Sequence, residues 1–198
     1  MTDSMYLYRQ NSLLIRWVAT ILLPILGLFF FNPAQLLANT ENTNHKILVF
    51  GDSLSAAYGL EPGEGWVTLL SERLQQQHYP VTVANASVSG ETTAGGLARL
   101  PAALQAHEPD LVILELGGND GLRGLPVPQM RSNLQAMIEM VLASHADVLL
   151  VGIQIPPNYG PRYTEPFYAQ YRELAEQYEL DLLPFLLEGI ADNPALMQ

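Results

Sequence analysis

The stretch ILVFGDSLSAAYG, residues 47–59, decides how the rest of the sequence is interpreted. Its first four residues are apolar, which is typical of a strand buried on both faces of a parallel sheet. The apolar run stops at Gly51-Asp52-Ser53, where small and polar residues indicate a turn at the carboxyl end of the strand. Ser53 is therefore either a nucleophile or one member of a polar turn.

Short apolar runs of this kind recur along the chain and alternate with amphipathic stretches. The expected strands are Lys46–Phe50, Val81–Ala86, Leu111–Leu116, Val148–Ile153 and Leu182–Phe185. Apolar residues at helical spacing lie between them, at 66–74, 134–142 and 167–178. This alternation predicts an α/β fold, with a parallel sheet covered by helices on both faces.

Two stretches depart from the simple alternation. The apolar residues of 97–104 predict a helix, but Pro101 interrupts it, so we expect irregular first turns around Gly95-Gly96. The one long connection is PPNYGPRYTE, residues 156–165. In sheets of this type the ligand crevice lies at the carboxyl ends of the strands, so the residues just after each strand are the candidates for a site.

The first 38 residues resemble a secretory signal rather than part of the fold. Arg9 and Arg16 precede an apolar run, Trp17–Phe31, and the small residue Ala38 stands before the polar run NTENTNH. This order predicts cleavage after Ala38, a periplasmic or secreted product and a domain spanning 39–198. An uncleaved membrane anchor is the alternative, although a bilayer needs about 20 residues.

Composition limits the partners. The net charge of −11 disfavours nucleic acid and anionic lipid, so we expect no nucleic-acid partner and membrane contact only through an uncleaved signal. The absence of cysteine excludes disulfides and thiolate metal sites. We expect a monomer that folds on its hydrophobic core alone.

Three polar clusters each come directly after a predicted strand: Gly51-Asp52-Ser53, residues 85–92 and residues 117–120. Singly, each has a structural explanation, because Gly-Asp-Ser and Gly-Gly-Asn-Asp suit turns and Ser-Gly-Glu-Thr suits the capped start of a helix. The carboxyl ends of parallel strands meet at one edge of a sheet, so all three clusters are expected on one rim.

The chemistry that these residue types suit together is acyl transfer. That reaction needs a nucleophile and hydrogen-bond donors directed at the developing oxyanion. Ser53 would attack, and its own N–H, the N–H of Gly90 and the amide of Asn119 would be the donors. Glycine at 90 lets a substrate approach the backbone closely, and asparagine is a neutral donor.

The motifs FGDSLS, ASVSGET and LGGNDGLRG resemble the first three sequence blocks of the SGNH, or GDSL, hydrolases. NYGPRYTEPF and LLPFLLE resemble the periplasmic thioesterase and lysophospholipase branch, and the similarity runs from about Ile47 to the last residue. The resemblance implies a serine esterase acting on small acyl esters or thioesters. It also implies a three-layer α/β/α sandwich, a five-stranded sheet in flavodoxin-like order, and no metal or organic cofactor.

We expect two loops, Gly121–Pro126 and Asn158–Tyr163, to wall the substrate pocket. Gly121 and Gly124 would let the first loop move, as lids near such sites do. Arg123 is either a contact for a polar substrate head or a solvated loop residue. The residues expected to contact the substrate are Asp52, Leu54, Gly121, Leu122, Arg123 and Tyr159.

A general base for Ser53 is missing from the pattern. The four histidines, His45, His78, His107 and His145, precede strands or end helices, so they are expected at the amino-terminal edge of the sheet. A strand of five residues spans about 17 Å, whereas a base must lie within about 3 Å of the hydroxyl. The favourable helix dipole explains these positions better.

In the resembled family the Asp and His come together as Asp-x-x-His beyond the fifth strand. Here Asp192 is followed by Asn193, Pro194 and Ala195, so it does not begin that block. We therefore expect an incomplete, nearly inactive domain without the catalytic Asp and His and without the last helix. A fragment, a frameshift, a premature stop and an evolved inactive protein all remain open.

Two rival functions stand beside the esterase. A non-catalytic acyl-binding protein would keep the crevice without the chemistry. A nucleotide or phosphate binder on a flavodoxin-like sheet is disfavoured, because the chain has neither G-x-G-x-x-G nor a glycine-rich Lys-Ser/Thr loop and is acidic.

Overall fold

A computed structural model describes residues 44–191 and 193 of the chain. The signal expected over residues 1–38 lies outside the described residues, as do Asp192 and 194–198. Among the described helices, none has the length and apolar character needed to cross a bilayer.

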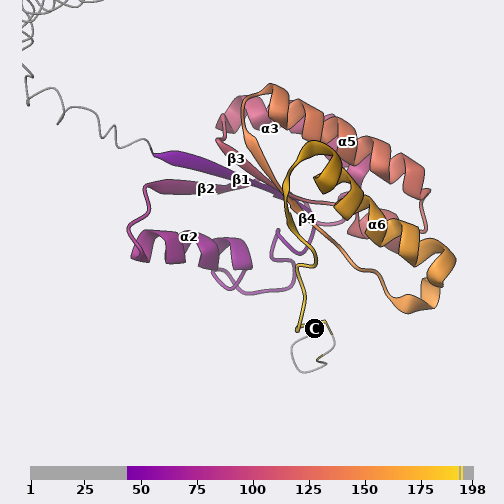
Figure 1. Ribbon diagram of the computed structural model, residues 1–198. Helices are drawn as coiled ribbons and strands as arrows, with labels where there is room; N and C mark the ends of the chain where they lie inside the picture. Colours follow the sequence, from indigo (N-terminus) through magenta and orange to yellow (C-terminus); the bar gives the residue numbers. More distant parts are fainter. Residues whose placement is uncertain (1–43, 192, 194–198) are drawn as a thin grey trace, which may run out of the picture. The chain divides into compact units, whose positions relative to one another are not determined.

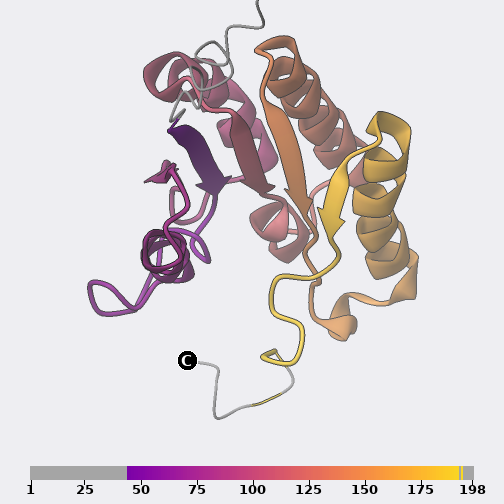
Figure 2. The ribbon, with the colours of Figure 1, turned by 60° about the vertical axis from the view of Figure 1, so that its left-hand side comes forward.

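A single five-stranded sheet in the order β2-β1-β3-β4-β5 forms the centre of the described fold. Its strands are β1 (His45–Gly51), β2 (Val81–Asn85), β3 (Leu111–Glu115), β4 (Asp147–Val151) and β5 (Asp181–Leu183). All neighbours are parallel, and the arrowheads of β1, β3, β4 and β5 point the same way in Figure 2. The expected parallel sheet and its flavodoxin-like order are confirmed, with β1 and β3 flanking the point where the strand order reverses.

Helices cover both faces of this sheet, as expected. The helices α3 (Thr93–His107), α5 (Val127–Ala143) and α6 (Pro161–Tyr178) lie on one face, and α2 (Trp66–Gln76) lies on the other (Figure 1). The larger core fills the three-helix side, where Phe50, Leu114 and Phe167 are fully buried. Val49, Val67, Ile113 and Val151 form a smaller core on the α2 side.

The prediction of an irregular start for α3 is wrong. The helix runs without a break from Thr93, its first turn is capped by the Thr92 side chain, and Gly95 and Gly96 are helical. The glycine at 96 serves close packing instead, because a Cβ there would lie 2.4 Å from Leu116 Cδ1 on the neighbouring sheet. The helix thus approaches the end of β3 closely enough to support the rim.

Two segments expected as loops are helical. The turn expected after β3 is a short helix, α4 (Gly118–Leu122), which takes up the first part of the Gly121–Pro126 loop. The long connection at 156–165 holds a 3₁₀ turn, η2 (Pro157–Tyr159), and the start of α6 at Pro161. Proline suits the first position of a helix because its missing N–H would have no partner there.

The last two strands end earlier in the structure than the sequence predicted. β4 ends at Val151 and β5 at Leu183, two residues before the predicted ends at Ile153 and Phe185. Pro184 has no N–H to donate to a neighbouring strand, which ends the ladder of β5. Both chain segments beyond these strands take part in the site.

Candidate active site

The polar segments after β1 and β3 meet at one cavity of about 750 Å³. Asp52, Ser53 and Leu54 line it from the first segment, and Gly118, Asn119 and Leu122 from the second. The cavity therefore opens at the strand-order reversal, where ligands bind in sheets of this type. Ser53 is half-buried, and its hydroxyl makes no hydrogen bond within the described part of the chain.

The turn that carries Ser53 is held by the carboxylate of Asp52. One oxygen of this buried group, Oδ1, accepts the N–H of Leu54 at 3.1 Å. The backbone then continues as a helical turn, with the N–H of Ala56 donating to the Asp52 carbonyl at 2.9 Å. Asp52 was expected to contact substrate, and the structure gives its carboxylate two protein partners, of which Leu54 is the first.

Asn119 is the second partner of Asp52. Its Nδ2 donates to Asp52 Oδ2 at 3.0 Å from the first turn of α4. This bond uses one of the two amide hydrogens and leaves the other for a ligand in the cavity. Burial raises the pKa of Asp52, and the hydrogen bonds from Leu54 and Asn119 oppose that rise by favouring the charged form.

Gly90 lies on the rim but does not line this cavity. Its φ of +79° is in the left-handed region that favours glycine, and its carbonyl accepts the Nη2 of Arg123 at 3.0 Å. Arg123 was expected either to meet a substrate head or to be a solvated loop residue; its side chain is exposed, as the second alternative expected, and it also bonds to the backbone of the 85–92 segment. The structure thereby links the segments after β2 and β3.

Several polar residues that the sequence analysis did not single out connect the three segments. Ser87 Oγ accepts the Gly51 N–H at 3.1 Å, and Asn85 Nδ2 donates to the Ser55 carbonyl at 2.7 Å. The carboxylate of Asp120 accepts both the N–H and the hydroxyl of Thr93, at 2.8 and 2.6 Å. All but Thr93 and Asn85 stand inside the quoted motifs, and Asn85 directly precedes one, so their position beside the candidate residues was the available signal.

Glu115 is the other residue that the sequence analysis missed. It ends β3, is fully buried, and accepts the Ser55 hydroxyl at 2.6 Å through Oε2. Burial, and then repulsion from the Asp52 carboxylate, raise the pKa of Glu115 to about 8. An acidic residue within the apolar run LVILEL was its signal in the sequence.

Of the other residues expected to contact the substrate, some line the cavity and some do not. Leu54 and Leu122 line the cavity, whereas Gly121 and Tyr159 do not. Gly121 is buried in α4, where a Cβ would lie 2.6 Å from Ile155 Cγ2, so close packing rather than loop movement explains this glycine. The Tyr159 hydroxyl donates to the Leu122 carbonyl at 2.7 Å.

The pocket walls differ from the two expected loops. Only Leu122 comes from residues 121–126, and no described lining residue comes from 158–163. The second loop faces elsewhere because Tyr159 and Tyr163 donate their hydroxyls to carbonyls of the 122–125 segment. The observed walls come after β4 and β5 and are mostly apolar: Ile153, Gln154, Ile155, Pro156, Pro157, Pro184, Phe185, Leu187, Glu188, Gly189 and Ala191.

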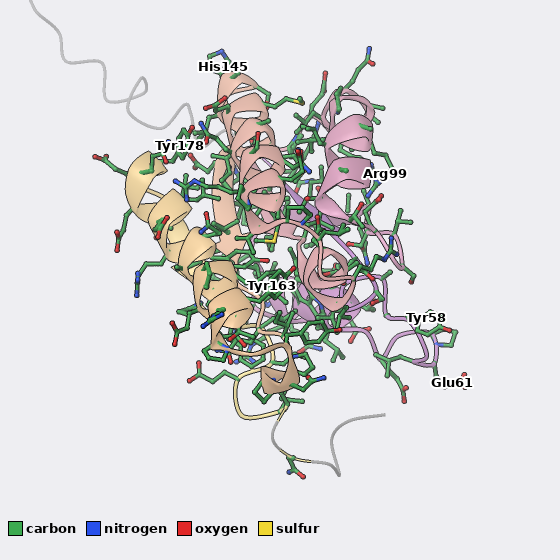
Figure 3. All side chains as sticks on the ribbon, turned by 90° about the vertical axis from the view of Figure 1, so that its right-hand side faces the viewer. Tyr58, Glu61, Arg99, His145, Tyr163 and Tyr178 are labelled. Carbon is green, nitrogen blue, oxygen red and sulfur yellow. The ribbon has the colours of Figure 1, made fainter. Side chains whose placement is uncertain are left out.

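All four histidines lie at the amino-terminal edge of the sheet, opposite the cavity. His45 is the first residue of β1 rather than its predecessor, and His107 ends α3. His78 and His145 stand just before β2 and β4 in the left-handed conformation. Figure 3 shows His145 at one end of α5 and Tyr163 near the other. The histidines lie at the beginnings of the strands and Ser53 follows the end of β1, so the length of the sheet separates every imidazole from Ser53. The described residues also contain no group of three or more side chains that could hold a metal ion.

The fold and the Gly-Asp-Ser and Gly-Gly-Asn-Asp rim are those expected of an ester hydrolase, and comparison with known proteins places the chain in that class. Residues 49–197 match the GDSL-like Lipase/Acylhydrolase family. The chain belongs to this family, also called the SGNH hydrolases, and it is an ester hydrolase by family.

Named relatives agree with this assignment. Esterase TesA of Pseudomonas aeruginosa is 50% identical over 165 residues, which cover 83% of this chain and 82% of the relative. The Thioesterase 1/protease 1/lysophospholipase L1 of Escherichia coli K12 is 45% identical over 152 residues, covering 77% and 72%. A crystal structure of TesA superposes with a TM-score of 0.76 at 52% identity and covers 78% of this chain and 86% of that one.

Proposed function

We propose that Ser53 is the nucleophile of an acyl-transfer reaction on small acyl esters or thioesters. Ser53 and Asn119 line one cavity, and Asp52 holds the Asn119 amide at 3.0 Å, which is the observation that carries the proposal. The Ser53 N–H, the Gly90 N–H and the second amide hydrogen of Asn119 would receive the oxyanion. Fixed donors of this kind stabilise the transition state without reorganisation.

The reaction has two balanced steps. Ser53 Oγ loses its proton to a base and attacks the acyl carbonyl, and collapse of the tetrahedral intermediate expels the alkoxide or thiolate, which takes up that proton. Water then attacks the acyl-serine, and the carboxylic acid leaves as Ser53 regains its hydroxyl. The mostly apolar walls after β4 and β5 suit an acyl chain. The described residues that line the cavity include no lysine, arginine or histidine that would call for a negatively charged group on the substrate.

The base must be supplied to this chain. Because its four histidines lie at the far edge of the sheet, we infer that the 198-residue chain turns over slowly by itself. Loss of one member of a catalytic triad reduces turnover by about ten-thousand-fold. An extended form for the test would carry an Asp-x-x-His block and a further helix after Gln198, so that an imidazole and a carboxylate are present in the same chain.

The test measures hydrolysis of a short-chain aryl ester by four proteins: the chain, its extended form, and each with Ser53→Ala. Imidazole is added in a second series as an external base, and the Ser53→Ala proteins correct for hydrolysis by imidazole alone. We expect a Ser53-dependent rate in the extended form and a smaller one in the chain with imidazole. Equal rates in the chain and its extended form, both abolished by Ser53→Ala, would reveal an unrecognised base.

A second candidate function is binding of an acyl ligand without chemistry. The apolar cavity and the distant imidazoles favour it together. Fluorescent fatty-acid titration and fluorophosphonate labelling of the extended form separate the two. Binding with an unlabelled Ser53 supports the binding protein, whereas labelling abolished by Ser53→Ala supports the esterase.

We also propose that the product is exported and cleaved after Ala38. The order of Arg16, the apolar run and Ala38 supports this. Amino-terminal sequencing of periplasmic material should begin at Asn39, and an intact Met1 on membrane-bound material would favour an anchor.

A further inference from the structure

Glu115 is a buried acid that the proposed reaction does not use. It pairs in register with Gly51 across β1 and β3, directly beneath the turn that carries Ser53. Its Oε2 accepts the Ser55 hydroxyl at 2.6 Å and the Asp52 N–H at 3.3 Å. Its Oε1 is also buried and has no hydrogen-bond partner in the described part of the chain.

Every titratable group that faces Glu115 is acidic or neutral. Asp52 lies on the adjoining turn, Asp120 on α4 acts on Asp52, and the Tyr171 hydroxyl comes from α6. None of the ion pairs among the described residues includes Glu115 or Asp52. An ionised Glu115 would leave a bare anionic oxygen in apolar surroundings beside a second carboxylate, which is strongly unfavourable.

The backbone of the turn rests directly on this carboxyl group. A Cβ on Gly51 would lie 2.5 Å from Glu115 Oε2 and 2.8 Å from Ser55 Oγ, so only glycine fits there. Movement of the Glu115 carboxyl must therefore move Gly51, Asp52 or Ser55. Through Asp52 such a movement reaches Asn119, whose amide the Asp52 carboxylate holds.

We propose that Glu115, as a neutral acid, is a positioning residue that holds the 51–55 turn and the Asp52–Asn119 pair for acyl transfer, and that its ionisation as the pH rises releases them. The catalytic part of this statement rests on the proposed function, whereas the control of the turn by Glu115 does not. Glu115 acts through Asp52 and Ser55 and does not touch the substrate.

Amide hydrogen exchange of a peptide covering residues 51–56, corrected for the intrinsic pH dependence of exchange, tests the control of the turn in the full chain. In the wild type we expect protection to fall by up to about tenfold per pH unit between pH 4.5 and about 8, because Glu115 ionises more easily in the open turn than in the closed one, and to level off above pH about 8. Glu115→Gln should show no such loss, and Glu72→Gln, which alters an exposed carboxyl on α2, should match the wild type.

Ser55→Ala gives a second measurement that does not depend on the folding of Glu115→Gln. It removes a hydrogen bond that favours ionised Glu115, so the loss of protection should continue to higher pH than in the wild type. Constant wild-type protection between pH 4.5 and about 8, or the same loss across that range in Glu115→Gln, would overturn the inference.

The same samples are assayed for Ser53-dependent ester hydrolysis with imidazole, which distinguishes this inference from the proposed function. A loss of protection between pH 4.5 and about 8 without any Ser53-dependent hydrolysis would refute the proposed function and leave the control of the turn standing. Hydrolysis in the wild type should decline above pH about 8 relative to Glu115→Gln. Parallel rate profiles in the two proteins would overturn the positioning role.

Discussion

Gly117→Ala should strongly destabilise the domain, because two independent costs coincide at this position. The φ of +122° is unfavourable for any residue with a Cβ, which costs about 1–3 kcal/mol. The new Cβ would also lie 2.2 Å from the Tyr171 hydroxyl, which is buried and donates to the Leu116 carbonyl at 2.9 Å. Overpacking of this kind costs about 1–3 kcal/mol, so we expect a total loss of about 2–6 kcal/mol.

Gly124→Ala is the matched control for the backbone term. Gly124 has a φ of +62°, and nothing lies within 4 Å of a Cβ placed there. This variant should lose only about 1 kcal/mol, since it meets backbone strain without a clash. The difference between the two variants therefore contains the contact with Tyr171 and any additional backbone cost of a φ of +122° compared with +62°.

A double-mutant cycle tests the clash itself. Tyr171→Phe removes the hydroxyl, so the nearest atom to an alanine Cβ at 117 becomes Met130 Sδ at 3.2 Å. Tyr171→Phe alone should cost about 1–3 kcal/mol, because it leaves the Leu116 carbonyl without its donor. In the double variant we expect about 1–3 kcal/mol of recovery relative to the sum of the single losses.

The assay is urea unfolding followed by circular dichroism, with the denaturant slopes compared to establish that the transitions are equivalent. Similar losses in Gly117→Ala and Gly124→Ala would show that packing against Tyr171 contributes nothing. Additive losses in the double-mutant cycle would refute the clash even if Gly117→Ala proved unstable.

Three further predictions concern the site and the core. In the extended form, Asn119→Ala should reduce turnover by about a hundredfold or more while leaving the unfolding midpoint close to that of the wild type, and an unchanged rate would remove Asn119 from the mechanism. Folded Glu115 binds its proton more tightly than the unfolded chain does, so its contribution to stability is fully present below pH 4.5 and declines up to pH about 8, by at most about 5 kcal/mol. Urea titrations across that range should show the stability of the wild type falling relative to that of Glu115→Gln. A constant difference between the two proteins would contradict this prediction. Phe167→Ala, at a fully buried position, should cost about 3–5 kcal/mol, whereas Leu69→Ala, at a position 52% exposed, should change the free energy of unfolding by less than about 0.5 kcal/mol.

The sheet could be predicted because its strands are continuous apolar runs, and parallel order then placed the polar segments on one rim. The apolar run that ends at Phe50 and the apolar run that begins at Leu111 were both predicted as strands, and they pair with each other in the structure. Local sequence pattern and tertiary packing agree in these strands, so the short-range signal was sufficient.

α4 could not be predicted in the same way. Its sequence GNDGL contains two glycines and no helical repeat of apolar residues. Contacts from distant segments define it: Thr93 donates to the Asp120 carboxylate, and Ile155 and Phe167 pack on Gly121. Tertiary contacts override weak local propensity here, as they often do in short helices.

The pocket walls were missed for a related reason. Motif similarity favoured residues 158–163, but strand order determines which chain segments leave the sheet beside Ser53. β4 lies next to β3 in the sheet order and β5 lies next to β4, so the segments after these two strands close the cavity. Aromatic residues such as Tyr163 serve to anchor the neighbouring loop.

The position of β1 between β2 and β3 in the sheet has a consequence for the order of events in folding. The Ser53 turn is supported by partners 60 to 67 residues further along the chain, through Ser55–Glu115, Asp52–Glu115 and Asn119–Asp52. Such contacts form slowly, because the entropy of closing a long loop is lost before the contact repays it. During synthesis the β1–α2–β2 segment can pair early, but the Ser53 turn acquires its supports only after β3 has been made and has docked. A nascent chain therefore contains the Gly-Asp-Ser sequence for as long as it takes to make some 60 further residues before the partners that fix the conformation of this turn exist.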